Sequence, residues 1–344
     1  MGTITAAQAV PNTRAGTRPV WLISQADDLV WFIGSALIGY AALGLMAAGF
    51  PVWPIQMLWM FGVDGPHVLA TVTRTYFDRE ERKRLGPAIW YLPPFVLLGP
   101  AMTLQGHFDL FLLGAVIWQH FHIVIQHFGF VMLYKAKNKE RDRFAVKLDR
   151  WVLLLSLWLP LVAFVARTRG FHAEWDRVAP AAYAIGAIAA LCWIGRQVRK
   201  YQRGEVMNVP KILLIGAVVP LQWFAFAHAA EHGPEGVLRA GIVLGLVHGL
   251  QYHRLLWFHN RNRYGGEDAE KRYGLAAKAS KSLIAYLAIA IGLNFFLTIL
   301  LVALAPWRDG VLAATWGIAF THYVFDAKIW RPSTDKGLAA ALRL

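Results

Sequence analysis

The chain has 344 residues, of which 57% are apolar, with 15 Trp and a mean hydropathy of +0.41. This composition excludes an ordinary soluble protein of this size. The single cysteine, Cys192, excludes an intrachain disulfide, a zinc ribbon and an iron–sulfur cluster held by one chain. The formal net charge is +14. Because the Lys and Arg residues lie in short segments between apolar runs, this charge is typical of a polytopic membrane protein and not of a nucleic-acid-binding protein.

The chain begins with a segment, 1–26, that lacks the apolar core of a cleavable signal peptide. About ten apolar stretches follow, each near the ~20 residues that cross a bilayer as a helix. We therefore expect an all-α fold: one transmembrane helical bundle over 27–331, and then a tail at 332–344. In chain order, the predicted spans are 29–50, 55–77, 87–105, 109–134, 151–167, 179–195, 211–230, 237–259, 283–305 and 311–330.

The connections between these stretches alternate in charge, which predicts their side of the membrane. The stretch 168–178 departs from the pattern because it carries Arg169 and Arg177. An even number of spans would place both termini in the cytoplasm, and we expect a multi-pass protein of the inner (cytoplasmic) membrane. The basic, predicted cytoplasmic connections are 78–86, 135–144, 196–205 and 260–281.

Histidines occur in four of the predicted spans at a similar depth. At 1.5 Å per residue, they fall within or close to a layer of roughly 10 Å in the inner half of the bilayer. Titratable side chains are costly at this depth and tend to face a bundle interior or a cofactor. Imidazole-rich sites with nearby carboxylates favour non-haem iron, although a lone histidine would more often be a hydrogen-bonded packing residue. The candidate metal ligands are His67, His120, His127, His248, His253 and His322.

Two carboxylates lie at helical spacing from these histidines. Asp64 precedes His67 by three residues, and Asp326 follows His322 by four, so each pair shares a helix face. A carboxylate in such a position orients a ligating histidine or balances the charge of the metal. Asp64 and Asp326 are therefore candidate catalytic side chains.

The span 237–259 leaves two alternatives open. His248 and His253 lie about 140° apart on a regular helix. A π-bulge after Gly249 would align them, and such bulges are frequent at functional sites. Tyr252 shares a face with His248 and is a third candidate catalytic residue.

The span 109–134 carries three histidines within eight residues. His120 and His127 are seven residues apart and share a face, so we expect His127 to be a metal ligand and His120 a ligand or near neighbour. His122 and Gln126 lie on another face. We expect them to form hydrogen bonds between helices or behind the ligands.

Four short windows, in this order, resemble the Brp/Blh-type bacterial β-carotene dioxygenases, a family of polytopic membrane proteins. The resemblance implies a histidine-held Fe(II), with O2 as co-substrate, that cleaves a carotenoid to give retinal. It also implies a lipophilic substrate that reaches the site from the bilayer. The windows are "DGPH" (Asp64–His67), "HFG" (His127–Gly129), "HGLQYH" (His248–His253) and "HYVFDAKIWR" (His322–Arg331).

Other functions remain open. A dinuclear iron hydroxylase or desaturase would use the same imidazoles and would need an electron donor. Transmembrane histidine pairs also bind b-type haem, and aspartates with histidines can relay protons in a transporter. "HAAEH" (His228–His232) matches a zinc peptidase pattern, H-x-x-E-H, but no second match supports it. We expect no nucleic-acid partner.

Overall fold

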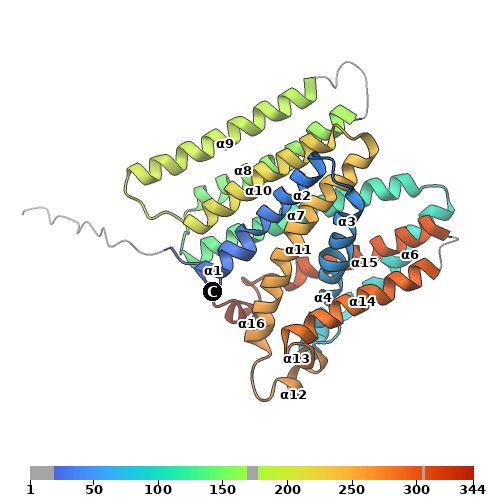
Figure 1. The fold of residues 1–344 in the computed structure, drawn as a ribbon. Helices are drawn as coiled ribbons and strands as arrows, with labels where there is room; N and C mark the ends of the chain where they lie inside the picture. Colours follow the sequence, from blue (N-terminus) through green and yellow to red (C-terminus); the bar gives the residue numbers. More distant parts are fainter. Residues whose placement is uncertain (1–18, 169–176, 304–306) are drawn as a thin grey trace, which may run out of the picture.

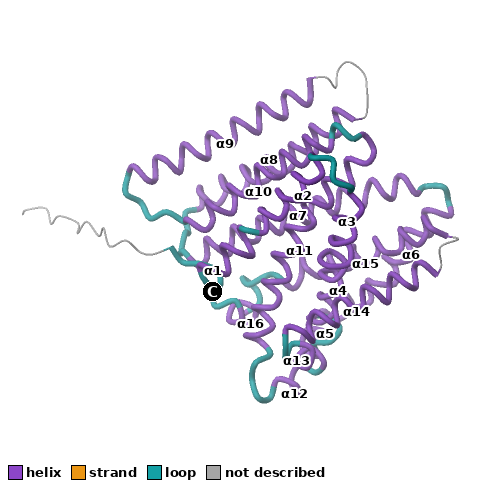
Figure 2. The backbone as a smooth tube through the Cα atoms, in the orientation of Figure 1, coloured by secondary structure: helices purple, strands orange, loops and turns teal. Residues whose placement is uncertain are grey.

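The computed structural model describes residues 19–168, 177–303 and 307–344 of the chain. These residues form helices joined by turns and contain no strand (Figures 1 and 2), so the all-α fold is confirmed for them. Most of the expected N-terminal segment 1–26, and most of the connection 168–178, lie outside the described residues.

The helical elements are mostly α-helices, but η1 and η2 are π-helical and η3 and η5 are 3-10 turns. The first half of the chain forms α1 (Gln25–Asp27), η1 (Asp28–Ile33), α2 (Ser35–Ala47), α3 (Val52–Met57), η2 (Leu58–Asp64), α4 (Gly65–Arg74), α5 (Arg79–Leu85), η3 (Gly86–Tyr91), α6 (Leu92–Leu104), α7 (Phe108–Lys137) and α8 (Arg143–Thr168). The second half forms α9 (Val178–Gln202), α10 (Val209–Ala229), η5 (Gly233–Glu235), α11 (Gly236–Arg263), α12 (Ala269–Tyr273), α13 (Leu275–Ala279), α14 (Leu283–Ala303), α15 (Arg308–Ile329) and α16 (Lys336–Ala341).

Seven helices among the described residues are long and apolar enough to cross a membrane, which supports a multi-pass membrane protein. Three further predicted spans, 55–77, 237–259 and 311–330, are helical but are not among the seven, because polar residues lower their hydropathy. The total of about ten spans remains a prediction. The seven helices are Gln25–Ala47, Arg79–Leu104, Phe108–Lys137, Arg143–Thr168, Val178–Gln202, Val209–Ala229 and Leu283–Leu300.

Helix α11 lies in the middle of the bundle, with α8, α9 and α10 on one side and α4, α14, α15 and α6 on the other (Figure 1). It contacts α2, α10, η2, α4 and α7. Its stretch from Ile242 to Gly249 is almost entirely buried. A helix that is covered on all sides can carry polar residues at membrane depth, because they face other helices and not lipid.

Both ends of the described chain bind the short connection between α7 and α8. The backbone of Val20 exchanges two hydrogen bonds with the side chain of Asn138, at 2.8 and 3.0 Å. Lys137 donates to the carbonyl of Arg343 at 2.7 Å. The two ends therefore lie on the same side of the bundle as the predicted cytoplasmic connection 135–144, as an even number of spans requires.

A buried ionic cluster joins α7, α8, α9 and α10 near this connection. Asp149 accepts from Lys135 at 2.6 Å, from Lys211 at 2.9 Å and from the indole of Trp193 at 3.0 Å. Glu140, in the connection itself, accepts from Lys211. Burial alone would raise the pKa of Glu140, but the neighbouring lysines outweigh it and lower this pKa to about 2.

The helix that carries His67 changes its winding just before that residue. Pro66 has no N–H and cannot donate to the carbonyl one turn earlier. The preceding residues, Leu58–Asp64, form the π-helical η2, and the N–H of Gly65 donates to the carbonyl of Met60, five residues back. A π-turn adds one residue per turn and so rotates everything that follows, including His67.

Two glycines let η2 lie against α11 without intervening side chains. A Cβ placed on Gly249 would lie 2.6 Å from Cγ1 of Val63, and one on Gly245 would overlap the indole nitrogen of Trp59. Gly245 and Gly249 form a G-x-x-x-G pattern, which allows membrane helices to approach closely. This close crossing brings α4, which follows η2, into register with α11 at the site described below.

We predict that the turn between α2 and α3 faces away from the cytoplasm. In a Cys192→Ser background, which removes the exposed native thiol, Phe50→Cys should react with a membrane-impermeant maleimide in intact cells. Arg141→Cys, in the basic connection after α7, should react only after permeabilisation, because positive charge resists translocation. Labelling of Arg141→Cys in intact cells would contradict this topology.

We also predict that Gly249→Ala lowers the thermal stability of the purified protein. The new methyl group would push η2 away from α11, and overpacking of this kind costs about 1–3 kcal/mol. Gly241→Ala, two turns earlier on α11, is the matched control, because a Cβ there meets nothing within 4 Å. Equal melting temperatures for the two variants would contradict a crossing that depends on Gly249.

Candidate metal centre

Four histidines from four different helices meet at the centre of the bundle. One ring nitrogen of each lies within 4.8 Å of the corresponding nitrogens of the other three. All four side chains are buried. The members of this four-histidine group are His67 on α4, His122 on α7, His248 on α11 and His322 on α15.

The shortest distances fit the coordination sphere of a single ion. Nε2 of His67 lies 3.1 Å from Nε2 of His248 and 3.1 Å from Nε2 of His322. Two nitrogens that each lie about 2.1 Å from one metal, at angles of roughly 90–110°, are about 3.0–3.4 Å apart. These two distances therefore match the spacing of ligands around one metal ion.

The hydrogen bonds of His67 identify which of its nitrogens is free to bind. Nδ1 lies 2.6 Å from the carbonyl oxygen of Asp64, which can only accept, so Nδ1 carries the proton in the neutral ring. Nε2 is then unprotonated, and it faces the other rings with a lone pair available for a metal. This fixed tautomer is the usual arrangement of a metal-binding histidine.

Two members of the group have buried nitrogens without a hydrogen-bond partner among the described residues. These are Nε2 of His122 and Nδ1 of His248. A buried polar atom left unpaired costs roughly 1–3 kcal/mol. A metal ion would satisfy Nε2 of His122 directly, which is the chemical fit expected of a binding site for a metal that prefers imidazole.

A second set of polar side chains supports His322 from behind. Oγ1 of Thr71 lies 2.6 Å from Nδ1 of His322 and 2.7 Å from the hydroxyl of Tyr252, which donates to Asp326 at 3.1 Å. The other oxygen of Asp326 lies 3.7 Å from Nε2 of His322 and 3.8 Å from Nε2 of His122. Asp326 therefore faces the group directly and also reaches it through Tyr252 and Thr71.

The sequence analysis predicted Asp326, Tyr252 and Asp64 near the site, and all three contact it or its supporting residues. Asp64 acts mainly through its backbone carbonyl, because its carboxylate lies 3.6 Å from Nδ1 of His67, on the side away from the other rings. Thr71 was not predicted. Its spacing of four residues from His67 is the signal that would have found it.

Three predicted ligands lie outside the four-histidine group. His120 contacts the carbonyl of Leu157 at 3.0 Å, His127 contacts the carbonyl of Ile123 at 2.9 Å, and His253 lies 2.9 Å from the hydroxyl of Tyr286. Hydrogen bonds to carbonyls and hydroxyls are how buried histidines are commonly satisfied in helical bundles.

The rotation of α7 explains why His122 joins the group. His122 lies about 200° around the helix from His120. The face with His120 and His127 packs toward α8 and α10, whereas His122 stacks on Tyr323 of α15, with ring centroids 4.3 Å apart. We had expected His122 to form hydrogen bonds only, so the structure differs from that expectation.

On α11 the structure brings His248, and not His253, into the group. The helix is α-helical throughout Gly236–Arg263, so the π-bulge considered after Gly249 does not form. The two histidines consequently point in different directions. The zinc-like pattern at His228–His232 places the rings of His228 and His232 4.3 Å apart, but it is not among the metal-type groups found in the described residues.

Comparisons of the chain with family models, with curated proteins and with solved structures find no match. The fold and the site thus define the protein at the level of class: a multi-pass helical bundle with a buried four-histidine group suited to a metal ion.

We predict that alanine at His67, His122, His248 or His322 removes metal from the purified protein, since one ligand of about four supplies a large share of the binding free energy. His107→Ala, at the exposed start of α7, should retain the metal. Elemental analysis of the detergent-purified variants measures this. Loss of metal in His127→Ala but not in His122→Ala would show that α7 presents its other face to the site.

Proposed function

We propose that the chain is a membrane-embedded oxygenase that holds non-haem iron in the four-histidine group and acts with O2 on a lipophilic substrate. The proposal rests on the metal-type histidine group together with the apolar groove that leads to it. A metal-type group without thiolates lies at the centre of the bundle, and an apolar groove reaches one of its histidines.

The groove lies between α4, α14 and α15 and has a volume of about 190 Å³. Its walls are mostly aliphatic and aromatic, and His322 and Thr71 are part of its lining. Phe296, on the α14 side, is largely exposed and would face lipid. The volume is below the roughly 300–1,000 Å³ of pockets that enclose a whole ligand. It suits one stretch of a hydrocarbon chain whose remainder stays in the bilayer.

Iron bound at this group would supply the activation of O2. The residues of the chain would hold the iron and orient the rings that bind it. The Asp64 carbonyl fixes the tautomer of His67, and Thr71 fixes the ring of His322. Asp326 places a carboxyl group beside the four imidazoles, where it would balance part of the charge of a bound metal. The buried walls exclude water, which strengthens these electrostatic interactions.

The geometry disfavours the haem alternative. The two axial histidines of a haem lie on opposite sides of the iron, about 4 Å apart, with the plane between them filled by the porphyrin. Here Nε2 of His67 is 3.1 Å from two other histidine nitrogens, and a fourth lies within 4.8 Å. These imidazoles occupy the space that a porphyrin would need.

Cleavage of a carotenoid is the reaction that the resemblance to the Brp/Blh-type dioxygenases favours. It needs no external electrons, because both oxygen atoms of O2 enter the products. Hydroxylation or desaturation of a lipid chain would use the same site but would need a reductant. The requirement for a reductant therefore separates the two reactions.

We predict that the protein, expressed in cells that make β-carotene, bleaches the pigment only when O2 is present. Retinal should accumulate if the substrate is that of the resembled family. Leu297→Trp should fill the groove and abolish bleaching while the metal stays bound. Ile299→Trp, on the same helix but outside the groove, is the control.

The purified protein should contain iron and show no Soret band. Iron-loaded protein that changes no polyene or acyl lipid in the presence of O2, with or without a reductant, would refute the oxygenase proposal. Equal activity of Leu297→Trp and Ile299→Trp would refute the groove as the substrate path.

A further inference from the structure

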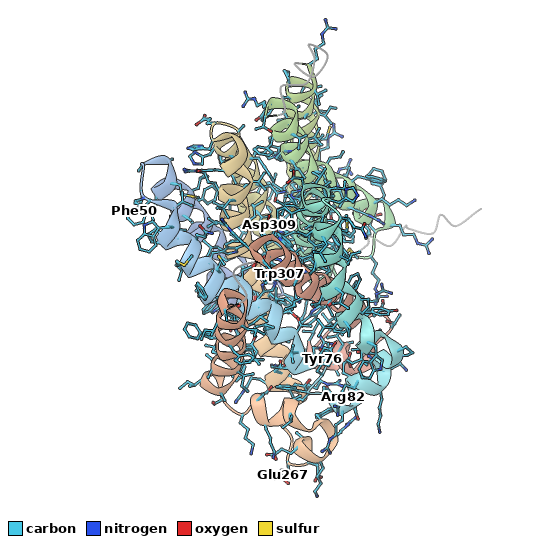
Figure 3. The ribbon with its side chains drawn as sticks, turned by 90° about the vertical axis from the view of Figure 1, so that its right-hand side faces the viewer. Phe50, Tyr76, Arg82, Glu267, Trp307 and Asp309 are labelled. Carbon is cyan, nitrogen blue, oxygen red and sulfur yellow. The ribbon has the colours of Figure 1, made fainter. Side chains whose placement is uncertain are left out.

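A basic concavity lies at the end of the molecule that carries α5 and α12. Its volume is about 550 Å³, and it is lined by five cationic side chains and one carboxylate. In Figure 3, the labelled Arg82 lies near this lower end, between Tyr76 and Glu267 and far from Phe50. The lining residues are Arg79, Glu80, Arg82, Lys83, Lys271 and Arg272.

The concavity is built from two segments that are about 190 residues apart in the chain and are held together by specific contacts. A backbone bridge pairs Asp78 with Gly274, whose φ of +73° is favourable only for glycine. Arg79 donates to the carbonyl of Lys271 at 3.1 Å. Asp78 also accepts from the N–H of Glu80 at the start of α5. The fold therefore holds together the two backbone segments that carry the cations.

Most of its positive charge is not neutralised by the protein. Two of the five lining cations have carboxylate partners: Arg272 pairs with Glu80, and Lys271 pairs with Asp268 at 3.1 Å. Within the described part of the chain, neither Arg82 nor Lys83 takes part in an ion pair. Cations that converge on one concave space and outnumber the carboxylates around it favour an anion with several oxygens. Arginine in particular matches the geometry of a phosphate group.

The positions of its lining residues in the sequence indicate that the concavity lies at a membrane surface. Tyr76 lines the apolar groove, and Arg79, three residues later, lines the concavity. The segment 78–86 is one of the connections that the charge pattern assigns to the cytoplasm. Basic pockets at the cytoplasmic ends of membrane helices are typical binding places for phosphorylated lipid headgroups.

We propose that this concavity binds a phosphate-bearing anion, with a lipid headgroup and a soluble phosphate compound as the two sources to be distinguished. The site is separate from the four-histidine group and does not depend on the oxygenase proposal. A ligand bound here would join α5 to α12 and so stabilise the connection between α4 and the segment after α11.

The test uses the full-length protein in nanodiscs of phosphatidylcholine, with or without phosphatidic acid, and the double variant Arg82→Gln/Lys83→Gln. Phosphatidic acid should raise the melting temperature of the unmodified protein and remain bound in native mass spectrometry. The double variant should bind it about 30-fold more weakly, because each cation near an anionic headgroup strengthens binding roughly fivefold. Metal content should be unchanged.

The control is Arg199→Gln/Arg203→Gln, which removes two exposed cations from a different basic connection. It should bind phosphatidic acid like the unmodified protein. A rise in melting temperature with inorganic phosphate in phosphatidylcholine nanodiscs, lost in Arg82→Gln/Lys83→Gln, would assign the site to a soluble phosphate compound. Equal losses in the two double variants, or none in either, would overturn the proposal.

Discussion

Where η2 crosses α11, Gly245 and Gly249 present no side chains, and the two backbones approach more closely than larger residues would permit. The remainder of the site depends on this approach, because His67 follows η2 and His248 lies between the two glycines. Their Nε2 atoms consequently lie 3.1 Å apart. In a bilayer, close packing of small residues replaces the hydrophobic effect as the force that joins helices. The same small residues that stabilise the bundle thus set the distance between two of its four central imidazoles.

The helices that carry the histidines could be predicted from the sequence, but the directions of the imidazole rings could not. His120, His122 and His127 lie on one helix, α7, as expected, yet only the packing of its neighbours decides which face meets α11. The spacing of His248 and His253 left a π-bulge after Gly249 open, but α11 has none. π-Helical turns occur at Asp28–Ile33 and at Leu58–Asp64, just before Pro66, which lacks a backbone donor. Three of the four helices of the site were predicted as spans but are not among the seven helices that are apolar enough to be evident spans. Helices α4, α11 and α15 are less apolar than the seven evident spans because they carry the polar residues that are gathered in the centre.

The polar side chains of α4, α11 and α15 lie in successive layers along these helices. Beyond the histidines lie Thr71, Tyr252 and Asp326, and beyond them lies a layer in which the guanidinium of Arg74 stacks 4.2 Å from the Trp330 ring. Arg74 is almost fully buried, and it donates to the carbonyl of Ile329. The apolar groove reaches His322 from a different direction, between α4, α14 and α15. An apolar groove therefore reaches the four-histidine group on one flank, and buried polar side chains extend from it on another.

The wide spacing of the four histidines along the chain has a consequence for biosynthesis. His67 and His322 are separated by 255 positions. At roughly 5–20 residues per second, a ribosome needs about 10–50 s to pass from one to the other. During that interval the early helices enter the membrane with an unpaired imidazole at its interior, and no complete ligand set exists to capture an ion. The last helices, α15 and α16, supply both the fourth histidine and the contact that closes the C-terminus against α7. The set of four histidines, and the contact that closes the bundle, are thereby completed only at the final stage of synthesis, after the other helices have been made.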